Sequence, residues 1–159
     1  MPKTTNTVQL TDLRAAIANS ASRYYRLVLL AGPSGAGKTP LLKAMSDEDD
    51  VPYLNVNLAL SERLLPLTLK QRPLRVHRLL AEILDAQPAP VVCLDNIELL
   101  FDPSLHQDPL VCLQGLSRNK TLVVAWGGQF EGTVLSYAEP GHPEYHRYDH
   151  PDAAIVVLT

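Results

Sequence analysis

A phosphate-binding turn has the spacing G-x-x-x-x-G-K-[ST], and this spacing occurs at Gly32-Pro33-Ser34-Gly35-Ala36-Gly37-Lys38-Thr39. The glycines let successive backbone N–H groups curl around an anion without Cβ clashes. A helix that follows such a turn adds its unpaired N–H groups and the positive end of its dipole. In this arrangement Lys38 reaches the β- and γ-phosphates and the Thr39 hydroxyl binds Mg²⁺. The turn therefore predicts binding of a nucleoside triphosphate with Mg²⁺, and ATP is the nucleotide we expect.

The residue after the turn, Pro40, has no backbone N–H. Proline is compatible with the first turn of a helix, because no intrahelical hydrogen bond is lost there. It nevertheless removes a donor that is often used near the α-phosphate, so we expect somewhat weakened binding. A Pro40→Ala variant that binds nucleotide less tightly would refute this expectation.

A second candidate for the chemistry is Asp95, which ends the apolar run Val91-Val92-Cys93-Leu94. In phosphate-turn enzymes a second buried strand carries an aspartate that holds the Mg²⁺, usually through water. We therefore predict that Thr39 and Asp95 form the metal site. The alternative is an aspartate that only caps a helix.

Buried strands alternate with helices on either side of these two motifs. Continuous apolar runs predict strands over 26–31, 91–95, 121–126 and 155–158. Alternation of Leu54, Val56 and Leu58 with two asparagines predicts an edge strand over 51–58. Helical spacing predicts helices over about 10–20, 41–46, 73–86 and 104–117, and less firmly near 130–137 before a Pro/His-rich loop. The pattern is that of an α/β fold with a mostly parallel sheet.

Composition restricts the function further. The chain has 159 residues, with 14 Lys and Arg against 17 Asp and Glu and a net charge of −3. This length predicts a single domain, 1–159, in which residues 1–9 form a flexible arm. The charge disfavours a general nucleic-acid binder. The sequence shows neither a membrane-length apolar stretch nor a signal peptide, so we expect no membrane contact and a cytoplasmic location.

Two smaller patterns suggest further contacts. Five cations, Arg63, Lys70, Arg72, Arg75 and Arg78, lie within sixteen positions and could meet DNA phosphates, although a solvated helix face is the favoured interpretation. His142, His146 and His150 recur every four residues, but the prolines and the glycine among them disfavour a helix. We therefore expect no metal site at these histidines.

The phosphate turn together with Val91–Leu100 (VVCLDNIELL) resembles the nucleotide-binding core of initiator-type AAA+ proteins, in the additional-strand branch of P-loop NTPases. The small size and the end directly after the last strand resemble the BrxF family of type III BREX bacteriophage-defence systems. The resemblance covers most of the chain, but only the two motifs are specific. It implies a three-layer αβα fold with strand order 5-1-4-3-2 and no C-terminal helical lid. It also implies work with itself or with larger BREX proteins in an assembly that blocks phage replication.

The resemblance also implies site roles that this sequence fills imperfectly. A glutamate usually follows the metal-holding aspartate in that branch, but here Asn96 follows, and the nearest acid is Glu98. Asn96 can orient a water molecule but cannot accept its proton, so Glu98 is either the base or a structural residue. Gln129 is the one obvious candidate for sensing the γ-phosphate, and Arg118 and Arg147 are the candidates for an arginine supplied to a neighbouring copy.

Three functions remain open at this stage. The first is an ATP-binding assembly switch that hydrolyses ATP slowly or only with a partner. The second is an adaptor that binds nucleotide without hydrolysing it, which Asn96 favours. The third is a small-molecule kinase, which is less favoured because the arginine-rich segment 63–78 lies where substrate-binding elements are more common than lids.

Overall fold

Five parallel strands form the central sheet of this computed structural model, which describes residues 2–159, with side chains from residue 9 onward. The strands lie in the order β2 (Tyr53–Asn55), β3 (Val91–Asp95), β4 (Thr121–Trp126), β1 (Leu27–Ala31) and β8 (Ala154–Val157). Read from β8 and counted along the chain, this is the predicted order 5-1-4-3-2. The α/β class and the strand order are therefore confirmed.

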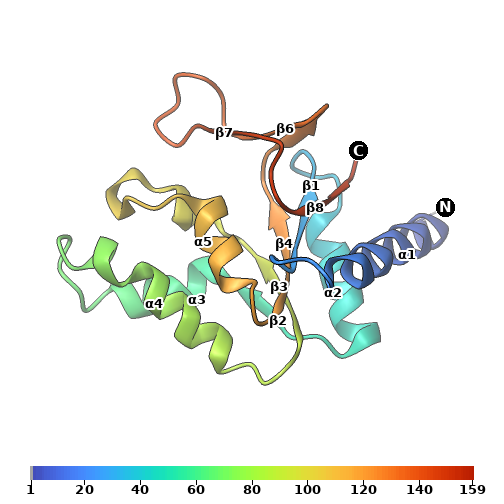
Figure 1. Ribbon diagram of the computed structural model, residues 1–159, viewed down its shortest axis with the longest axis horizontal. Helices are drawn as coiled ribbons and strands as arrows, with labels where there is room; N and C mark the ends of the chain where they lie inside the picture. Colours follow the sequence, from blue (N-terminus) through green and yellow to red (C-terminus); the bar gives the residue numbers. More distant parts are fainter. Residues whose placement is uncertain (1) are drawn as a thin grey trace.

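Helices cover both faces of this sheet, so the fold has three layers (Figure 1). Helices α1 (Pro2–Ser20) and α2 (Lys38–Asp49) lie on one face, where Val28 and Leu30 of β1 point. Leu27 and Leu29 point to the other face, toward α3 (Val56–Leu64), α4 (Arg72–Asp85) and α5 (Pro109–Leu116). Burial on both faces explains why the strands are continuously apolar. Within residues 2–159, no helix is apolar over the length that a bilayer crossing requires.

The expected edge strand over 51–58 is wrong beyond its first half. Strand β2 ends at Asn55, and α3 begins at Val56. The Asn55 side chain accepts a hydrogen bond from the backbone N–H of Leu58 at 3.0 Å, as a helix N-cap does. The cap ends the strand, so the alternation of Leu54, Val56 and Leu58 is not that of a strand.

The helix expected near 130–137 is also wrong, because this region forms a second, antiparallel sheet. Its strands are β5 (Gln129–Glu131), β6 (Val134–Tyr137) and β7 (His146–Asp149). Glu131 pairs with Val134 across a two-residue turn in which Gly132 has φ of +61°. A glycine at positive φ suits such a hairpin.

Aromatic side chains attach this small sheet to the main body. The rings of Phe101 and Tyr137 stack with centroids 3.5 Å apart, and Phe101 meets Trp126 edge-on at 5.2 Å. The indole N–H of Trp126 donates to the carbonyl of Ser136 at 3.0 Å. The last residues of β4 therefore fix where β6 and the loop after it lie.

Other boundaries shift less. The helix expected over about 104–117 forms only as α5 (Pro109–Leu116), which follows two 3₁₀ turns, η1 (Glu98–Phe101) and η2 (Pro103–Leu105). Asp102 accepts a hydrogen bond from the backbone N–H of Ser104, and Asp108 accepts one from the backbone N–H of Val111. Each aspartate therefore caps the start of a new helical segment. Helix α1 begins at Pro2 rather than near Leu10. Residues 2–9 of the arm expected over 1–9 belong to this helix, and the flexibility of the arm stays a prediction.

Candidate nucleotide-binding site

The phosphate turn links β1 to α2 at the carboxyl edge of the sheet, as open parallel sheets place ligand sites. Gly35 and Gly37 have φ of +84° and +101°, a conformation that costs other residues free energy. At position 32 a glycine is needed because there is no room for a side chain. A Cβ there would lie 2.6 Å from the carbonyl oxygen of Leu158. The turn is therefore shaped both by its own glycines and by the end of β8.

The Lys38 ammonium group is held inside the turn. It donates hydrogen bonds to the carbonyl oxygens of Gly32 at 2.5 Å and Pro33 at 2.9 Å. Partial burial lowers the pKa of Lys38 from its ordinary value, and the negative charges of Asp95 and Glu98 act against that shift. The side chain is thus oriented over the turn, where a phosphate would replace the carbonyl contacts.

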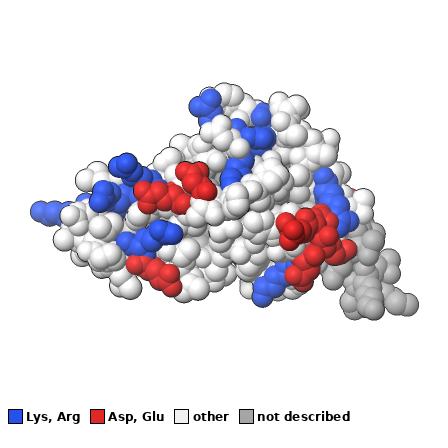
Figure 2. Space-filling model, turned by 90° about the horizontal axis from the view of Figure 1, so that it is seen from below, with Lys and Arg blue, Asp and Glu red and all other residues white. Residues whose placement is uncertain are grey.

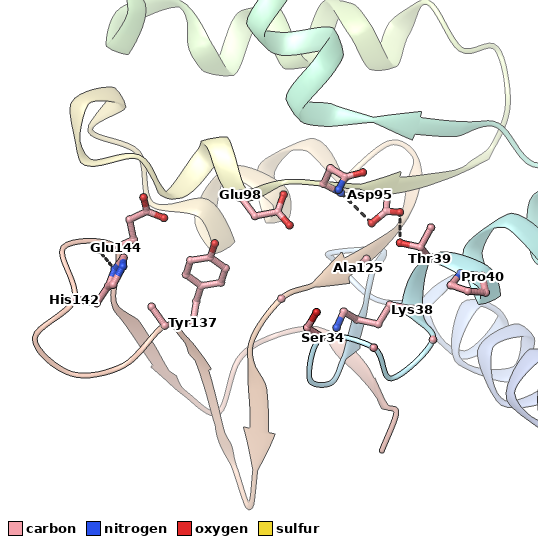
Figure 3. A pocket seen from close by; sticks show the side chains of 15 residues that line it. Ser34, Lys38, Thr39, Pro40, Asp95, Glu98, Ala125, Tyr137, His142 and Glu144 are labelled. Carbon is pink, nitrogen blue, oxygen red and sulfur yellow. Dashed lines mark hydrogen bonds between the residues drawn. The ribbon is translucent and has the colours of Figure 1, made fainter.

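Asp95 meets the turn from β3, as the sequence predicts (Figure 3). Asp95 is 4% exposed, and its Oδ2 accepts a hydrogen bond from the Thr39 hydroxyl at 2.6 Å. Oδ1 accepts from the backbone N–H of Asn96 at 3.0 Å. A hydroxyl and a carboxylate this close are the oxygen donors that Mg²⁺ takes, so Thr39 and Asp95 fit the ion.

Tyr53 is a site residue that the sequence analysis missed. Tyr53 is the first residue of β2, and its hydroxyl donates to Oδ2 of Asp95 at 2.5 Å, the same oxygen that Thr39 contacts. Burial, followed by the hydrogen bond to Asp95, raises the pKa of Tyr53 well above its ordinary value. The hydroxyl therefore stays a donor. Strand β2 lies beside β3 in the predicted order, and that adjacency was the available signal.

Asn96 and Glu98 lie in the turn that follows β3. Asn96 adopts a left-handed conformation with φ of +54°, which asparagine tolerates better than most residues. The turn redirects the chain, so Glu98 faces the same cavity as Lys38. Oε2 of Glu98 accepts a hydrogen bond from the side-chain amide of Asn57 at 3.0 Å, and Oδ1 of Asn57 accepts from the Leu99 N–H at 2.9 Å. Asn57, which the sequence analysis also missed, thus holds Glu98 from α3.

These groups line one open cavity of about 720 Å³. Its floor comprises the phosphate turn with Pro40, and its side wall is Asp95, Asn96 and Glu98. The wall opposite the turn is formed by Tyr137, His142 and Glu144, from β6 and the loop that follows it (Figure 3). The volume lies within the range of small-molecule sites. The region expected to be an unstructured loop therefore supplies a wall of the site.

The remaining candidates lie outside this cavity. Gln129 and Arg147 line a neighbouring cavity of about 550 Å³, on the other side of Pro33. Arg118 precedes β4, at the amino edge of the sheet, with its guanidinium 4.3 Å from the ring centroid of Tyr24. The cations of segment 63–78 lie on α3, α4 and their connection. Gln129 and Arg147 therefore share a cavity with Pro33 of the phosphate turn but do not line the cavity of Lys38, Thr39 and Asp95, and Arg118 lines neither of the two.

Comparison with known proteins agrees with this geometry. Residues 28–123, more than half of the chain, match the family described as "ATPase family associated with various cellular activities (AAA)". The chain belongs to the AAA family. The matched span contains the phosphate turn, Asp95 and Glu98. Nucleotide binding is the property that this matched span shares with the other ATPases of the family.

Two further comparisons were made for this AAA chain. No curated protein shows a significant match. Among solved structures 22 chains match, one of them "Structure of C. elegans PCH-2", at 18% identity and a TM-score of 0.38. That match covers 81% of this chain and 37% of the PCH-2 chain, so the AAA chain described here spans well under half of that protein.

Proposed function

We propose that this AAA chain binds ATP with Mg²⁺ and hydrolyses it slowly, or only when a partner completes the site. One observation carries the proposal: Thr39 Oγ1 lies 2.6 Å from Asp95 Oδ2 beside Lys38, in a cavity of about 720 Å³. The turn amides and Lys38 bind the phosphates, and Thr39 and Asp95 would hold the ion. When bound, Mg²⁺ supplies positive charge to the phosphate oxygens.

Slow hydrolysis is supported by two residues that follow Asp95, which are Asn96 and Glu98. Asn96 stands where related ATPases have a glutamate, and its amide orients a water molecule without accepting a proton. Among the described residues, three carboxylates line the cavity, those of Asp95, Glu98 and Glu144. In our proposal Glu98 accepts the proton. Asn57 holds Glu98 by a hydrogen bond, which restricts the movement of the carboxylate toward an attacking water molecule.

The biological setting that we propose is based on the small size of the chain and the position of its phosphate turn near residue 32, which resemble those of a BREX protein. We infer that nucleotide binding controls assembly with further copies or with larger partners in an anti-phage complex. The open cavity supports this idea, because a neighbouring molecule can approach the bound phosphates. Arg118 and Arg147 are the arginines we propose for such a contact between copies.

The test of nucleotide binding is a calorimetric titration with ATP in the presence and absence of Mg²⁺. Lys38→Ala removes a charge-assisted contact worth about 1.5–3 kcal/mol, so its affinity should fall by at least about tenfold. Lys70→Ala is the matched control, because Lys70 is an exposed lysine far from the cavity. Unchanged affinity in Lys38→Ala, or no Mg²⁺-dependent binding in the natural chain, contradicts the proposal.

The test of hydrolysis is thin-layer analysis of radiolabelled ATP with and without candidate acceptors. We expect slow release of free phosphate that Glu98→Gln abolishes. Fast turnover by the isolated protein, lost in Asn96→Ala and kept in Glu98→Ala, contradicts the assigned roles. A labelled metabolite identifies a kinase instead.

A second candidate function is a nucleotide-binding adaptor that does not hydrolyse ATP. The presence of Asn96 directly after Asp95 favours it. In the same assay an adaptor leaves labelled ATP intact, while the titration still shows binding that depends on Lys38.

A further inference from the structure

Three leucines are strongly exposed at the connection between α3 and α4. Leu65, Leu69 and Leu74 have 74%, 72% and 84% of their surface exposed, and all three lie within ten residues. Isolated apolar side chains are common on surfaces, but a group of this kind marks an interaction site. We define the leucine tip as these leucines together with the cations Arg63, Lys70 and Arg75.

The connection that carries the leucines is ordered by hydrogen bonds. The backbone N–H of Thr68 donates to Oε1 of Gln71 at 3.0 Å, and the N–H of Gln71 donates to Oγ1 of Thr68 at 3.3 Å. This reciprocal pair is a capping box, and it lies directly before α4. Leu64 is buried and Leu67 packs against the core, which anchors the chain on either side of Leu65. The exposed leucines are therefore presented by a well-defined turn.

The leucine tip is also positively charged. Between residues 63 and 75 the chain carries four cations and no acid. Arg63, Lys70 and Arg75 make no ion pair with any of the residues that the structure describes. In Figure 2 blue side chains lie outermost at the end where α3 and α4 are found, and red ones lie nearer the middle. A partner for this surface must therefore offer both an apolar environment and negative charge.

The position of the leucine tip restricts the kind of partner further. The connection between α3 and α4 lies at one end of the molecule, away from α1 (Figure 1), and none of the tip residues lines the nucleotide cavity. A protein partner would need a recess shaped for three leucines. The interface of a bilayer accepts apolar side chains without a preformed recess. Duplex DNA would meet the cations but leave the leucines in water.

We infer that the leucine tip binds the surface of an anionic phospholipid membrane. The three leucines enter the boundary between headgroups and acyl chains, and the three cations bind the lipid phosphates. This contact lies on the membrane and does not cross it. The expectation of no membrane contact was based on the lack of a spanning stretch, which a surface contact does not need. The contact goes beyond the proposed ATP binding and requires no nucleotide.

The first experiment is co-sedimentation of the full chain with lipid vesicles in the absence of nucleotide. The vesicles contain phosphatidylcholine alone, or phosphatidylcholine and phosphatidylglycerol in equal parts. Because the cations meet lipid phosphates, we expect the anionic vesicles to bind the chain at least about tenfold more strongly than the neutral ones. High salt should weaken the binding, since it screens exposed charges.

Two double variants separate the charged part of the leucine tip from its apolar part. Lys70→Glu with Arg75→Glu reverses two charges, and Leu69→Ser with Leu74→Ser removes two apolar side chains. We expect each double variant to lower the partition coefficient for anionic vesicles by about tenfold or more.

Each double variant has a matched control outside the leucine tip. Arg23→Glu reverses the charge of an exposed arginine after α1, and Val111→Ser removes an exposed apolar side chain of α5. Both controls should bind anionic vesicles nearly as the natural chain does. Circular dichroism of each variant shows whether it is folded.

The decisive experiment uses a tryptophan probe to test whether the leucines enter the bilayer. The chain has one tryptophan, Trp126, and it is fully buried, so its emission should not respond to vesicles. In Leu69→Trp we expect the emission to shift to shorter wavelength when anionic vesicles are added, because the new indole leaves water for the membrane interface. Val111→Trp is the control, and its emission should not shift.

Several results overturn the inference. They are a natural chain that does not bind anionic vesicles, double variants that bind as their controls do, and a Leu69→Trp emission that does not shift. If a double variant is unfolded, the Leu69→Trp result decides. Binding of duplex DNA or of an acidic peptide that depends on the leucine tip, without binding of vesicles, also overturns it and assigns the tip to that partner. None of these results affects the Lys38 titration, so the proposed ATP binding is tested separately.

Discussion

At the scale of single residues, the carboxylate of Asp95 is where most of the site's contacts converge. It accepts hydrogen bonds from Thr39, Tyr53 and the N–H of Asn96, all within 3.0 Å. The contact between Thr39 and Asp95 was predictable, because each of these residues belongs to a recognisable sequence motif. The contact with Tyr53 was not, since a tyrosine in an edge strand carries no signature of a role in metal binding.

We predict that Tyr53→Phe weakens the Mg²⁺ dependence of ATP binding. The hydroxyl orients Oδ2 of Asp95, and loss of such a supporting contact lowers metal affinity by about tenfold or more. The measurement is a Mg²⁺ titration at fixed ATP. Tyr148→Phe is the control, because its hydroxyl donates to Asp108 at 2.8 Å away from the cavity. An equal effect in both variants would mean a general loss of stability.

We predict that Asn57→Ala raises the basal rate of ATP hydrolysis. Without the amide of Asn57, the carboxylate of Glu98 is free to turn toward the attacking water molecule. We expect the rate to increase roughly tenfold, which is less than the 10²–10⁴-fold rate enhancement that a general base typically contributes. Steady-state phosphate release measures it.

The control for Asn57→Ala is Asn55→Ala, which removes the cap of α3 without touching Glu98. If Asn55→Ala accelerates hydrolysis equally, loosening of α3 explains the effect. A lower rate in Asn57→Ala would show that Asn57 positions Glu98 for the reaction instead of restraining it.

At the scale of elements, the junction between β4 and the small sheet is closely packed. A Cβ at Gly128 would lie 1.7 Å from the carbonyl oxygen of Ser136. We predict that Gly128→Ala destabilises the protein by about 1–3 kcal/mol, because the backbone of β6 must move. Urea unfolding measures the change. Gly127→Ala is the matched control, since its nearest neighbour would be a ring carbon at an ordinary 3.5 Å.

Helices α1 and α2 are tied by the pair Arg14–Asp49. The Arg14 hydrogen bond lowers the pKa of Asp49, so the pair stabilises the fold fully above the unfolded-state pKa of about 3.9. We predict that the stability difference between the natural chain and Arg14→Ala disappears as pH falls through the folded-state pKa of Asp49. Urea unfolding at several pH values checks this. A difference that persists at low pH would assign the effect to packing.

The elements also differ in how well the sequence predicts them. Strands β3 and β4 match their predicted bounds, because burial on both faces leaves an unbroken apolar run. Region 129–149 was not predictable by helical or strand period, since its strands have three or four residues each. Its one usable signal, Gly132 between Phe130 and Val134, is weak in isolation.

At the scale of the whole molecule, the sequence predicts the half of the cavity that comes from motifs. Lys38, Thr39 and Asp95 meet as expected, and Glu98 faces them. The opposite wall of Tyr137, His142 and Glu144 depends on a tertiary contact, the stacking of Phe101 on Tyr137. No local sequence pattern encodes that contact. The position of Gln129 beside a different cavity also depends on tertiary packing, so the sequence did not predict it.

The position of β1 has a consequence for biosynthesis. This strand leaves the ribosome early, yet both of its sheet neighbours, β4 and β8, are translated at least ninety residues later. Both edges of β1 stay unpaired meanwhile, and Gly32 gains its packing partner only with Leu158. Nascent chains stalled before Leu158 should therefore remain unable to retain nucleotide and should attract chaperones.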